Sequence, residues 1–212
     1  NSGQIGNMEN MLNDWPNIGR YANANKELKP AAPGEKRVVF MGNSITDAWI
    51  NSDPDYFKNN PYIDRGISGQ TTPQMLVRFN EDVINLKPAV VVILAGTNDI
   101  AGNTGTETLE EIFENIVAMT QLARANNIRV VISSVLPAYD YPWRPGKKPA
   151  EKIVALNKML KDYADEHKIV YLNYYDSLVD ERKGMQAGYS KDGVHPTLAG
   201  YRVMEPLADK AI

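Results

Sequence analysis

The stretch Ala89-Val90-Val91-Val92-Ile93-Leu94-Ala95, closed by Gly96, decides the fold class of this chain. It is apolar at every position, whereas a strand with one solvated face alternates apolar and polar residues. A continuous apolar run of this length is typical of a parallel strand whose sheet is covered by helices on both faces. We therefore predict a parallel sheet buried inside the molecule.

Similar short runs lie on either side of this stretch, with helical patterns between them. The predicted strands are 37–41, 62–66, 129–135 and 169–172, of which 62–66 is the weakest and is assigned to an edge. Apolar residues spaced three and four apart predict helices at 72–86, 108–125, 153–163 and 196–208. This alternation predicts an α/β fold, a three-layer α/β/α sandwich with about five parallel strands.

The first 36 residues precede the first predicted strand and have a different character. We expect a helix that contains Trp15, followed by a linker with Pro30, Pro33 and Gly34. A domain holds roughly 150 residues, so the 212 residues of the chain suit one decorated domain. We predict an N-terminal helical extension at 1–36, packed on a single domain at 37–212.

The composition excludes several classes of function. The chain has no cysteine, which removes thiolate nucleophiles, iron–sulfur clusters and zinc fingers, and only two histidines. The net charge of −3 and the lack of a basic block argue against binding of nucleic acid. No apolar run is long enough to span a membrane. The absent cysteines and the start at Asn1 fit an exported (periplasmic or extracellular) protein that has lost its signal peptide, and they fit a chain trimmed at its start equally well. The oligomeric state is not predicted.

Polar residues follow the predicted strands at the edge where α/β sheets bind ligands. Ser44 follows the first strand, in a turn beside Gly42, where a serine hydroxyl can be exposed as a nucleophile. Its simpler interpretation is a cap for the following short helix. Asp192 and His195 stand three residues apart in a late loop, where they can supply a base and the acid that orients it. Capping of a turn and of the last helix is an equally good interpretation of that pair.

The other histidine, His167, lies in a charged run at a predicted helix end and is interpreted as a surface residue. Gly69 and Asn98 follow two further strands and can present N–H donors to an oxyanion, together with the amide of Ser44. Each of them is also explained by a turn or a helix cap. Because all these residues are expected at one edge of the sheet, a catalytic function is favoured over the interpretation of each residue as a turn or a helix cap.

The residues quoted above resemble those of the SGNH hydrolases, also called GDSL-type lipases or acylhydrolases. The matching blocks are 42–46, Gly69, 96–99 and 192–196. The resemblance implies a flavodoxin-like fold with strand order 2-1-3-4-5, and an esterase that needs no cofactor and no metal. It implies Ser44 as nucleophile, His195 as base and Asp192 as orienting acid. Ser44, Gly69 and Asn98 would form the oxyanion hole.

Within this family, the sequence looks similar to the platelet-activating-factor acetylhydrolase-like and carbohydrate-esterase-like members. It departs from the pattern at Asn43, where the family usually has Asp, and this puts the hydrogen bonding of the Ser44 turn in question. We expect a small-molecule or carbohydrate ester as substrate, with a short acyl chain, because no apolar lid helix is evident. Tyr141, Trp143 and Arg144 are candidate substrate-binding residues, although simple packing of a long loop explains them equally well.

Three other functions remain open at this stage. The first is a lysophospholipase or thioesterase-type lipid hydrolase of the same family. The second is a non-catalytic, flavodoxin-like binding module: either a nucleotide or phosphate binder that uses the turn at 42–46 to hold the anion, or an interaction module with the fold but without catalysis. The third is a metal-dependent hydrolase that uses Asp47, Asp99, Asp192 and His195.

Overall fold

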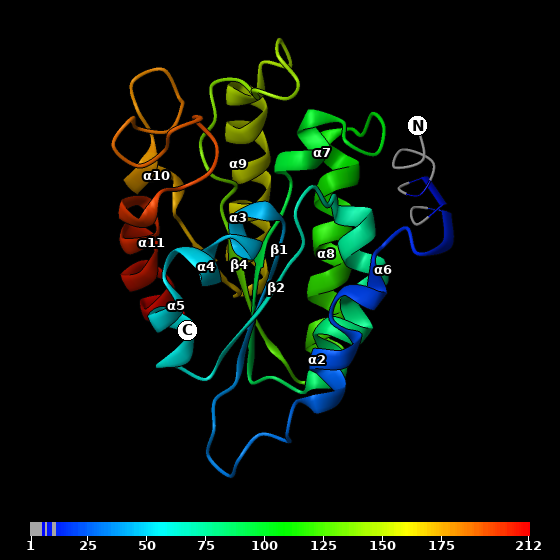
Figure 1. Ribbon diagram of the computed structural model, residues 1–212. Coiled ribbons are helices and arrows are strands. Elements are labelled where there is room, and N and C mark those ends of the chain that lie inside the picture. Colours follow the sequence, from blue (N-terminus) through cyan, green and yellow to red (C-terminus); the bar gives the residue numbers. More distant parts are fainter. Residues whose placement is uncertain (1–5, 7, 10–11) are drawn as a thin grey trace.

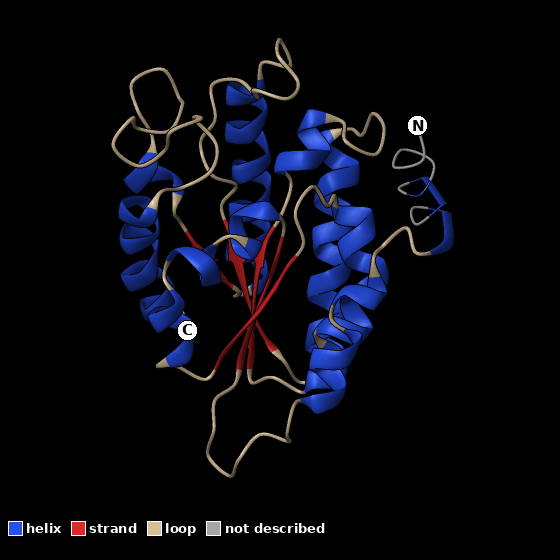
Figure 2. Cartoon of the chain, in the orientation of Figure 1, coloured by secondary structure: helices blue, strands red, loops and turns tan. Residues whose placement is uncertain are grey.

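A five-stranded parallel sheet forms the centre of the computed structural model, which describes residues 6, 8–9 and 12–212 (Figure 1, Figure 2). The strand order β2-β1-β3-β4-β5 confirms the predicted order, and the weak strand lies at an edge as expected. The apolar stretch quoted first becomes the central strand. The strands are β1 (Val38–Gly42), β2 (Tyr62–Gly66), β3 (Val90–Leu94), β4 (Arg129–Ser133) and β5 (Val170–Leu172).

The continuous apolar character of β3 arises because its two faces belong to two different cores. Val91 and Ile93 pack into one hydrophobic cluster with helices α6 (Thr72–Asp82), α8 (Leu109–Ala125) and α9 (Pro149–His167). Val90, Val92 and Leu94 pack into a second cluster on the opposite face. That cluster includes residues of α4 (Trp49–Ser52), α5 (Pro54–Lys58), α10 (Tyr175–Leu178) and α11 (Leu198–Ala211). The result is the predicted three-layer sandwich.

Several predicted boundaries are corrected by the structure. The helix expected at 72–86 ends at Asp82 and is followed by a short 3-10 helix, η2 (Ile84–Leu86). The strand expected at 129–135 ends at Ser133, because the N–H and C=O of Val135 pair with the side chain of Asn157 at 2.7 and 3.0 Å. The helix expected at 153–163 extends further at both ends, from Pro149 to His167.

The N-terminal segment packs against α6 rather than standing apart from the domain. It contains the short helices η1 (Ile18–Arg20) and α2 (Ala22–Glu27), and both contact α6 (Figure 1). Trp15 lies in a turn and not in the expected helix, since Pro16 disfavours helical backbone at the residue before it. Across the described residues, no helix combines the length and apolar character that crossing a membrane requires.

Candidate active site

Loops from the carboxyl edge of the sheet converge on Ser44. β1 leads through Asn43 into α3 (Ser44–Asp47), β2 leads into the loop at 67–71, and β3 leads into α7 (Thr97–Ala101). The loop at 190–197, just before α11, reaches the same place. Its His195 Nε2 lies 2.9 Å from Ser44 Oγ, although 151 positions separate the two residues in the chain.

The turn after β1 presents the Ser44 hydroxyl because its neighbour performs the capping. Asn43 Oδ1 accepts a hydrogen bond of 3.1 Å from the Ile45 N–H, so Asn43 is the N-cap and Ser44 is the first residue of α3. The interpretation of Ser44 as a helix cap is therefore wrong. Asn43 retains the acceptor oxygen that an Asp would supply. Its buried Nδ2 has no hydrogen-bond partner among the described residues.

His195 lies between Ser44 and Asp192. Its Nδ1 is 2.6 Å from Asp192 Oδ2, and its Nε2 is 2.9 Å from Ser44 Oγ. When Nδ1 carries the proton and donates it to the carboxylate, Nε2 is left with a lone pair that accepts the Ser44 hydroxyl proton. This arrangement can activate a serine for attack on a carbonyl carbon.

Hydrogen bonds within its own loop keep the Asp192 carboxylate ionised. Burial acts to raise its pKa, but hydrogen bonds from His195 and Val194 outweigh burial and lower the pKa to about 2. Oδ1 accepts from the backbone N–H of Val194 at 2.9 Å and from that of His195 at 2.8 Å. Ser190 closes the loop by accepting from the Gly193 N–H at 2.9 Å. Asp192 is consequently a carboxylate at neutral pH, as the orientation of an imidazole requires.

Each of the three residues predicted to form the oxyanion hole has an N–H group that no acceptor among the described residues takes up. The Ser44 amide has no intrahelical acceptor, because Ser44 opens α3. The Gly69 amide donates no hydrogen bond within the described chain, and its φ of 81° lies in the left-handed region that favours glycine. The buried Asn98 donates one Nδ2 proton to the Gln70 carbonyl oxygen at 2.9 Å and retains a second.

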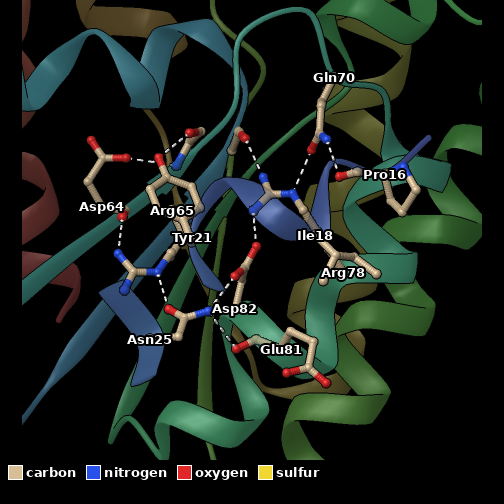
Figure 3. A network of polar contacts seen from close by, with 12 residues as sticks. Pro16, Ile18, Tyr21, Asn25, Asp64, Arg65, Gln70, Arg78, Glu81 and Asp82 are labelled. Carbon is tan, nitrogen blue, oxygen red and sulfur yellow. Dashed lines mark hydrogen bonds and ion pairs between the residues drawn. The ribbon is translucent and has the colours of Figure 1, made fainter. Parts of the chain in front are cut away.

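A buried guanidinium braces these loops, and the sequence analysis missed it. Arg78 is fully buried on α6 and donates to the Gln70 side-chain oxygen at 2.6 Å, to Asp82 at 2.9 Å and to the Gly42 carbonyl oxygen at 3.0 Å (Figure 3). It thereby joins the end of β1 to the loop that carries Gly69. The sequence does contain a signal for this contact: Arg78 and Asp82 form a pair of opposite charges, four residues apart, within the apolar stripe of the helix.

A cavity of about 710 Å³ opens beside the loop that carries Gly69. Trp143 and Arg144 line it, as their assignment to substrate binding requires. Trp143 lies with its ring centroid 6.1 Å from that of His195. Tyr141 does not line this cavity: it is fully buried and stacks on Trp143 with centroids 5.0 Å apart. Its ring supports the Trp143 indole from behind, and a direct contact of Tyr141 with substrate stays a prediction.

The acidic residues suggested for a metal site serve separate purposes. Asp47 Oδ2 accepts from the Ser68 hydroxyl at 2.6 Å, which ties the turn of Ser44 to the next loop. Asp99 is buried and accepts from the backbone N–H of Thr72 at 2.7 Å. Within the described part of the chain, no group of three His, Asp or Glu side chains is placed to hold a metal ion.

Comparison with known proteins identifies the family. The model of the GDSL-like Lipase/Acylhydrolase family matches residues 40–203, which include Ser44, Gly69, Asn98, Asp192 and His195. The chain belongs to this family. Its five-stranded α/β fold is the one that the resemblance to this family implied.

Two solved structures of this family are similar to the chain over nearly its whole length. One is a proposed acylhydrolase from Bacteroides fragilis, 55% identical, with a TM-score of 0.92 over 93% of this chain and 96% of that one. The other is a GDSL-like lipase from Bacteroides thetaiotaomicron, 52% identical, with a TM-score of 0.90 over 92% of this chain and 97% of that one.

Curated relatives of this GDSL-type acylhydrolase are more distant. Platelet-activating factor acetylhydrolase IB subunit alpha2 from Homo sapiens is 29% identical over 135 residues, which cover 60% of this chain and 54% of that protein. A lipoprotein of Bacillus subtilis is 30% identical over 93 residues, 42% of this chain and 38% of that one. The chain thus spans about half or less of these relatives. An acetyl-xylooligosaccharide esterase of Geobacillus, 16% identical with a TM-score of 0.68, shares the fold.

Proposed function

We propose that this acylhydrolase cleaves short-chain esters, acetyl esters above all, through an acyl-enzyme formed on Ser44. The observation that carries the proposal is the continuous chain of contacts from Ser44 Oγ to His195 Nε2 at 2.9 Å and from His195 Nδ1 to Asp192 Oδ2 at 2.6 Å. These are the contacts that a nucleophile, a general base and an orienting acid need.

In the proposed first step, Ser44 Oγ attacks the ester carbonyl carbon while His195 Nε2 takes the hydroxyl proton. The amides of Ser44 and Gly69 and the Asn98 side chain then hold the oxyanion. Collapse of this intermediate breaks the bond to the alcohol, which leaves with the proton from His195. In the second step, water attacks the acyl group on Ser44, again with His195 as base, and the carboxylic acid leaves. The two proposed reaction steps use neither a metal ion nor an organic cofactor.

The preference for a short acyl chain is supported by the surroundings of the site. Beside Ile67 and the two indoles of Trp15 and Trp143, the side chains that line the cavity next to Gly69 are polar. A long aliphatic chain would need a continuous apolar lining to be removed from water. A hydrolase of lysophospholipids or thioesters with long chains is therefore the less favoured alternative.

The nucleophile is tested by replacing Ser44 with Ala. We expect kcat for p-nitrophenyl acetate to fall by about 10³-fold or more, with the free energy of unfolding almost unchanged. Labelling by a fluorophosphonate probe should disappear as well. Ser52→Ala is the matched control, because Ser52 bonds only the backbone of its own helix, at 2.9 Å from the Ala48 carbonyl oxygen. Near-full activity of Ser44→Ala would show that another group is the nucleophile.

The acyl chain length is tested with p-nitrophenyl esters from acetate to decanoate. We expect kcat/KM to be highest for acetate and to fall with chain length. Faster turnover of decanoate would contradict the short-chain proposal and favour the lipid hydrolase.

A further inference from the structure

The N-terminal segment at 13–17 forms part of the wall of the cavity beside the proposed active site. Asn13, Trp15 and Asn17 line the cavity together with Trp143 and Arg144. The segment therefore reaches the loop of Gly69, although it precedes the family match, which begins at residue 40.

Hydrogen bonds hold this segment in place against α6 and the loop that precedes it. Gln70 Nε2 donates to the Pro16 carbonyl oxygen at 2.6 Å (Figure 3), and Gln74 Nε2 donates to that of Trp15 at 2.9 Å. Gln70 also accepts from Arg78 and, through its backbone oxygen, from Asn98. The wall is thus connected through one residue to the proposed oxyanion hole.

Contacts with neighbouring residues also hold the part of the cavity that Trp143 lines. Trp143 stacks on Tyr141 and donates its indole N–H to Asn103 Oδ1 at 3.1 Å. Asn103 Nδ2 in turn donates to the Gly69 carbonyl oxygen at 3.1 Å. The indole is therefore fixed relative to the loop where the ester carbonyl would lie. Trp15 and Trp143 remain 36% and 38% exposed, so both indoles still offer surface to a ligand.

The chemistry of the cavity favours a neutral ligand with many hydroxyl groups. Side-chain amides such as those of Asn13, Asn17 and Asn103 both donate and accept hydrogen bonds without carrying charge. Indole rings add flat apolar surfaces on which the C–H face of a sugar ring can pack. The lining also carries one carboxylate, Asp14, and one guanidinium, Arg144, so its two charges are of opposite sign. The Asp14 carboxylate accepts from the backbone N–H groups of Ile18 and Gly19, both at 2.8 Å.

We propose that the segment at 13–17, together with Trp143 and Arg144, binds the alcohol part of the ester, and that this alcohol is a sugar unit. This inference rests on the proposed function, because it assigns the acyl group to Ser44 and the leaving group to the cavity. It makes Trp15 a specificity-determining residue that lies outside residues 40–203, the part matched by the family model.

The experiment compares three acetyl esters with the same acyl group: p-nitrophenyl acetate, an acetylated xylo-oligosaccharide and octyl acetate. In Trp15→Ala and in Asn13→Ala, we expect the ratio of kcat/KM for the acetylated sugar to that for p-nitrophenyl acetate to fall by about tenfold, mainly through KM. Leu122→Ala is the control, because Leu122 is similarly exposed on α8 and does not line the cavity. Its ratio should stay the same.

The deacetylated oligosaccharide provides a second measurement. It should inhibit the hydrolysis of p-nitrophenyl acetate competitively in the unmodified protein and more weakly in Trp15→Ala. An unchanged ratio in both variants would overturn the inference, and so would faster turnover of octyl acetate than of the sugar ester. Failure of the proposed function would appear as retained activity of Ser44→Ala on p-nitrophenyl acetate. Failure of the present inference would instead leave Ser44→Ala inactive and the substrate ratio of Trp15→Ala and Asn13→Ala unchanged.

Discussion

At the scale of single residues, the proposed chemistry depends on which nitrogen of His195 carries its proton. Asp192 Oδ2 lies 2.6 Å from Nδ1, while Oδ1 is occupied by two backbone N–H groups. The carboxylate therefore has one oxygen for its own loop and one for the imidazole. Because its pKa is lowered to about 2, its contribution to stability is present above the unfolded value of about 3.9 and is lost only as the pH falls through about 2.

The first prediction replaces Asp192 with Asn. Asn Oδ1 can keep the two backbone hydrogen bonds, but Nδ2 would then donate to His195 Nδ1 and move the ring proton to Nε2. We expect kcat for p-nitrophenyl acetate to fall by about 10³–10⁴-fold with little loss of stability. Asp180→Asn is the control, because Asp180 also accepts backbone hydrogen bonds in a loop but does not contact His195. A loss under tenfold would show that Asp192 does not set the tautomer.

At the scale of the elements, the Ser44 turn depends on close packing against the end of β2. A Cβ atom on Gly66 would overlap the backbone of Thr46 and Asp47 and lie 2.8 Å from the Asn43 carbonyl oxygen. None of these atoms can move away without displacing α3, because they are all backbone. The glycine therefore permits the short distance between α3 and β2.

The second prediction follows from this packing. Gly66→Ala should lower the free energy of unfolding by about 3 kcal/mol and reduce esterase activity, because α3 and Ser44 must shift. Urea denaturation and the hydrolysis of p-nitrophenyl acetate measure the two effects. Gly188→Ala is the matched control, since a Cβ there meets no atom within 4 Å. Equal stability of the two variants would refute the close-packing argument.

A pair of carboxyl groups links α7, which carries Asn98, to the segment before α8. Burial raises the pKa of Asp99, and burial together with the charge of Asp99 raises the pKa of Glu107 to about 7. When protonated, Glu107 donates a hydrogen bond to the Asp99 carboxylate. An unfolded chain loses the Glu107 proton near pH 4.3, whereas the folded protein keeps it until about pH 7. The stabilisation is therefore complete at low pH and is lost as the pH rises through about 7.

The third prediction uses Glu107→Gln, which donates a hydrogen bond at every pH. For the unmodified protein, we expect the contribution of this pair to the free energy of unfolding to decrease as the pH rises from about 4.5 to about 7.5. For the variant, the decrease in this range should be smaller. Urea titrations at a series of pH values measure it, with Glu110→Gln on the exposed side of α8 as control. Parallel curves for Glu107→Gln and the unmodified protein would contradict the shared-proton arrangement.

At the scale of the whole molecule, Arg78 joins segments that lie far apart in the chain. It contacts the end of β1, the loop of Gln70 and Asp82, while Asn25 of α2 donates to Asp82 at 2.7 Å (Figure 3). Both charged side chains of the Arg78–Asp82 pair are fully buried. Loss of one partner would leave the other charge inside the protein without compensation.

The fourth prediction is a double-mutant cycle on this pair. Arg78→Met and Asp82→Leu should each lower the free energy of unfolding by about 3–5 kcal/mol, since each leaves one buried charge unpaired. The double variant should be more stable than the sum of the two losses indicates. Urea denaturation measures all three proteins. Additive losses would show that the two side chains act independently.

Much of this protein is determined by the sequence itself. Continuous apolar runs and periodic stripes predict the strands, the helices and their layers, because burial on two faces imposes these local patterns. The residues after the strands are also visible, since parallel strands bring their carboxyl ends to one edge. The predicted ends of strands are wrong where a side chain takes the place of a backbone hydrogen-bond partner, as the Asn157 side chain does at Val135.

Only the tertiary structure decided which of these residues meet. The 2.9 Å distance from Ser44 to His195, the support of Trp143 by Tyr141 and the position of Trp15 at the cavity join segments that are distant in the chain. Local sequence preferences do not encode such contacts, because they depend on how whole helices and loops pack over the sheet. The sequence thus determined the kind of fold and the edge that carries the site, and the packing determined the geometry of the site.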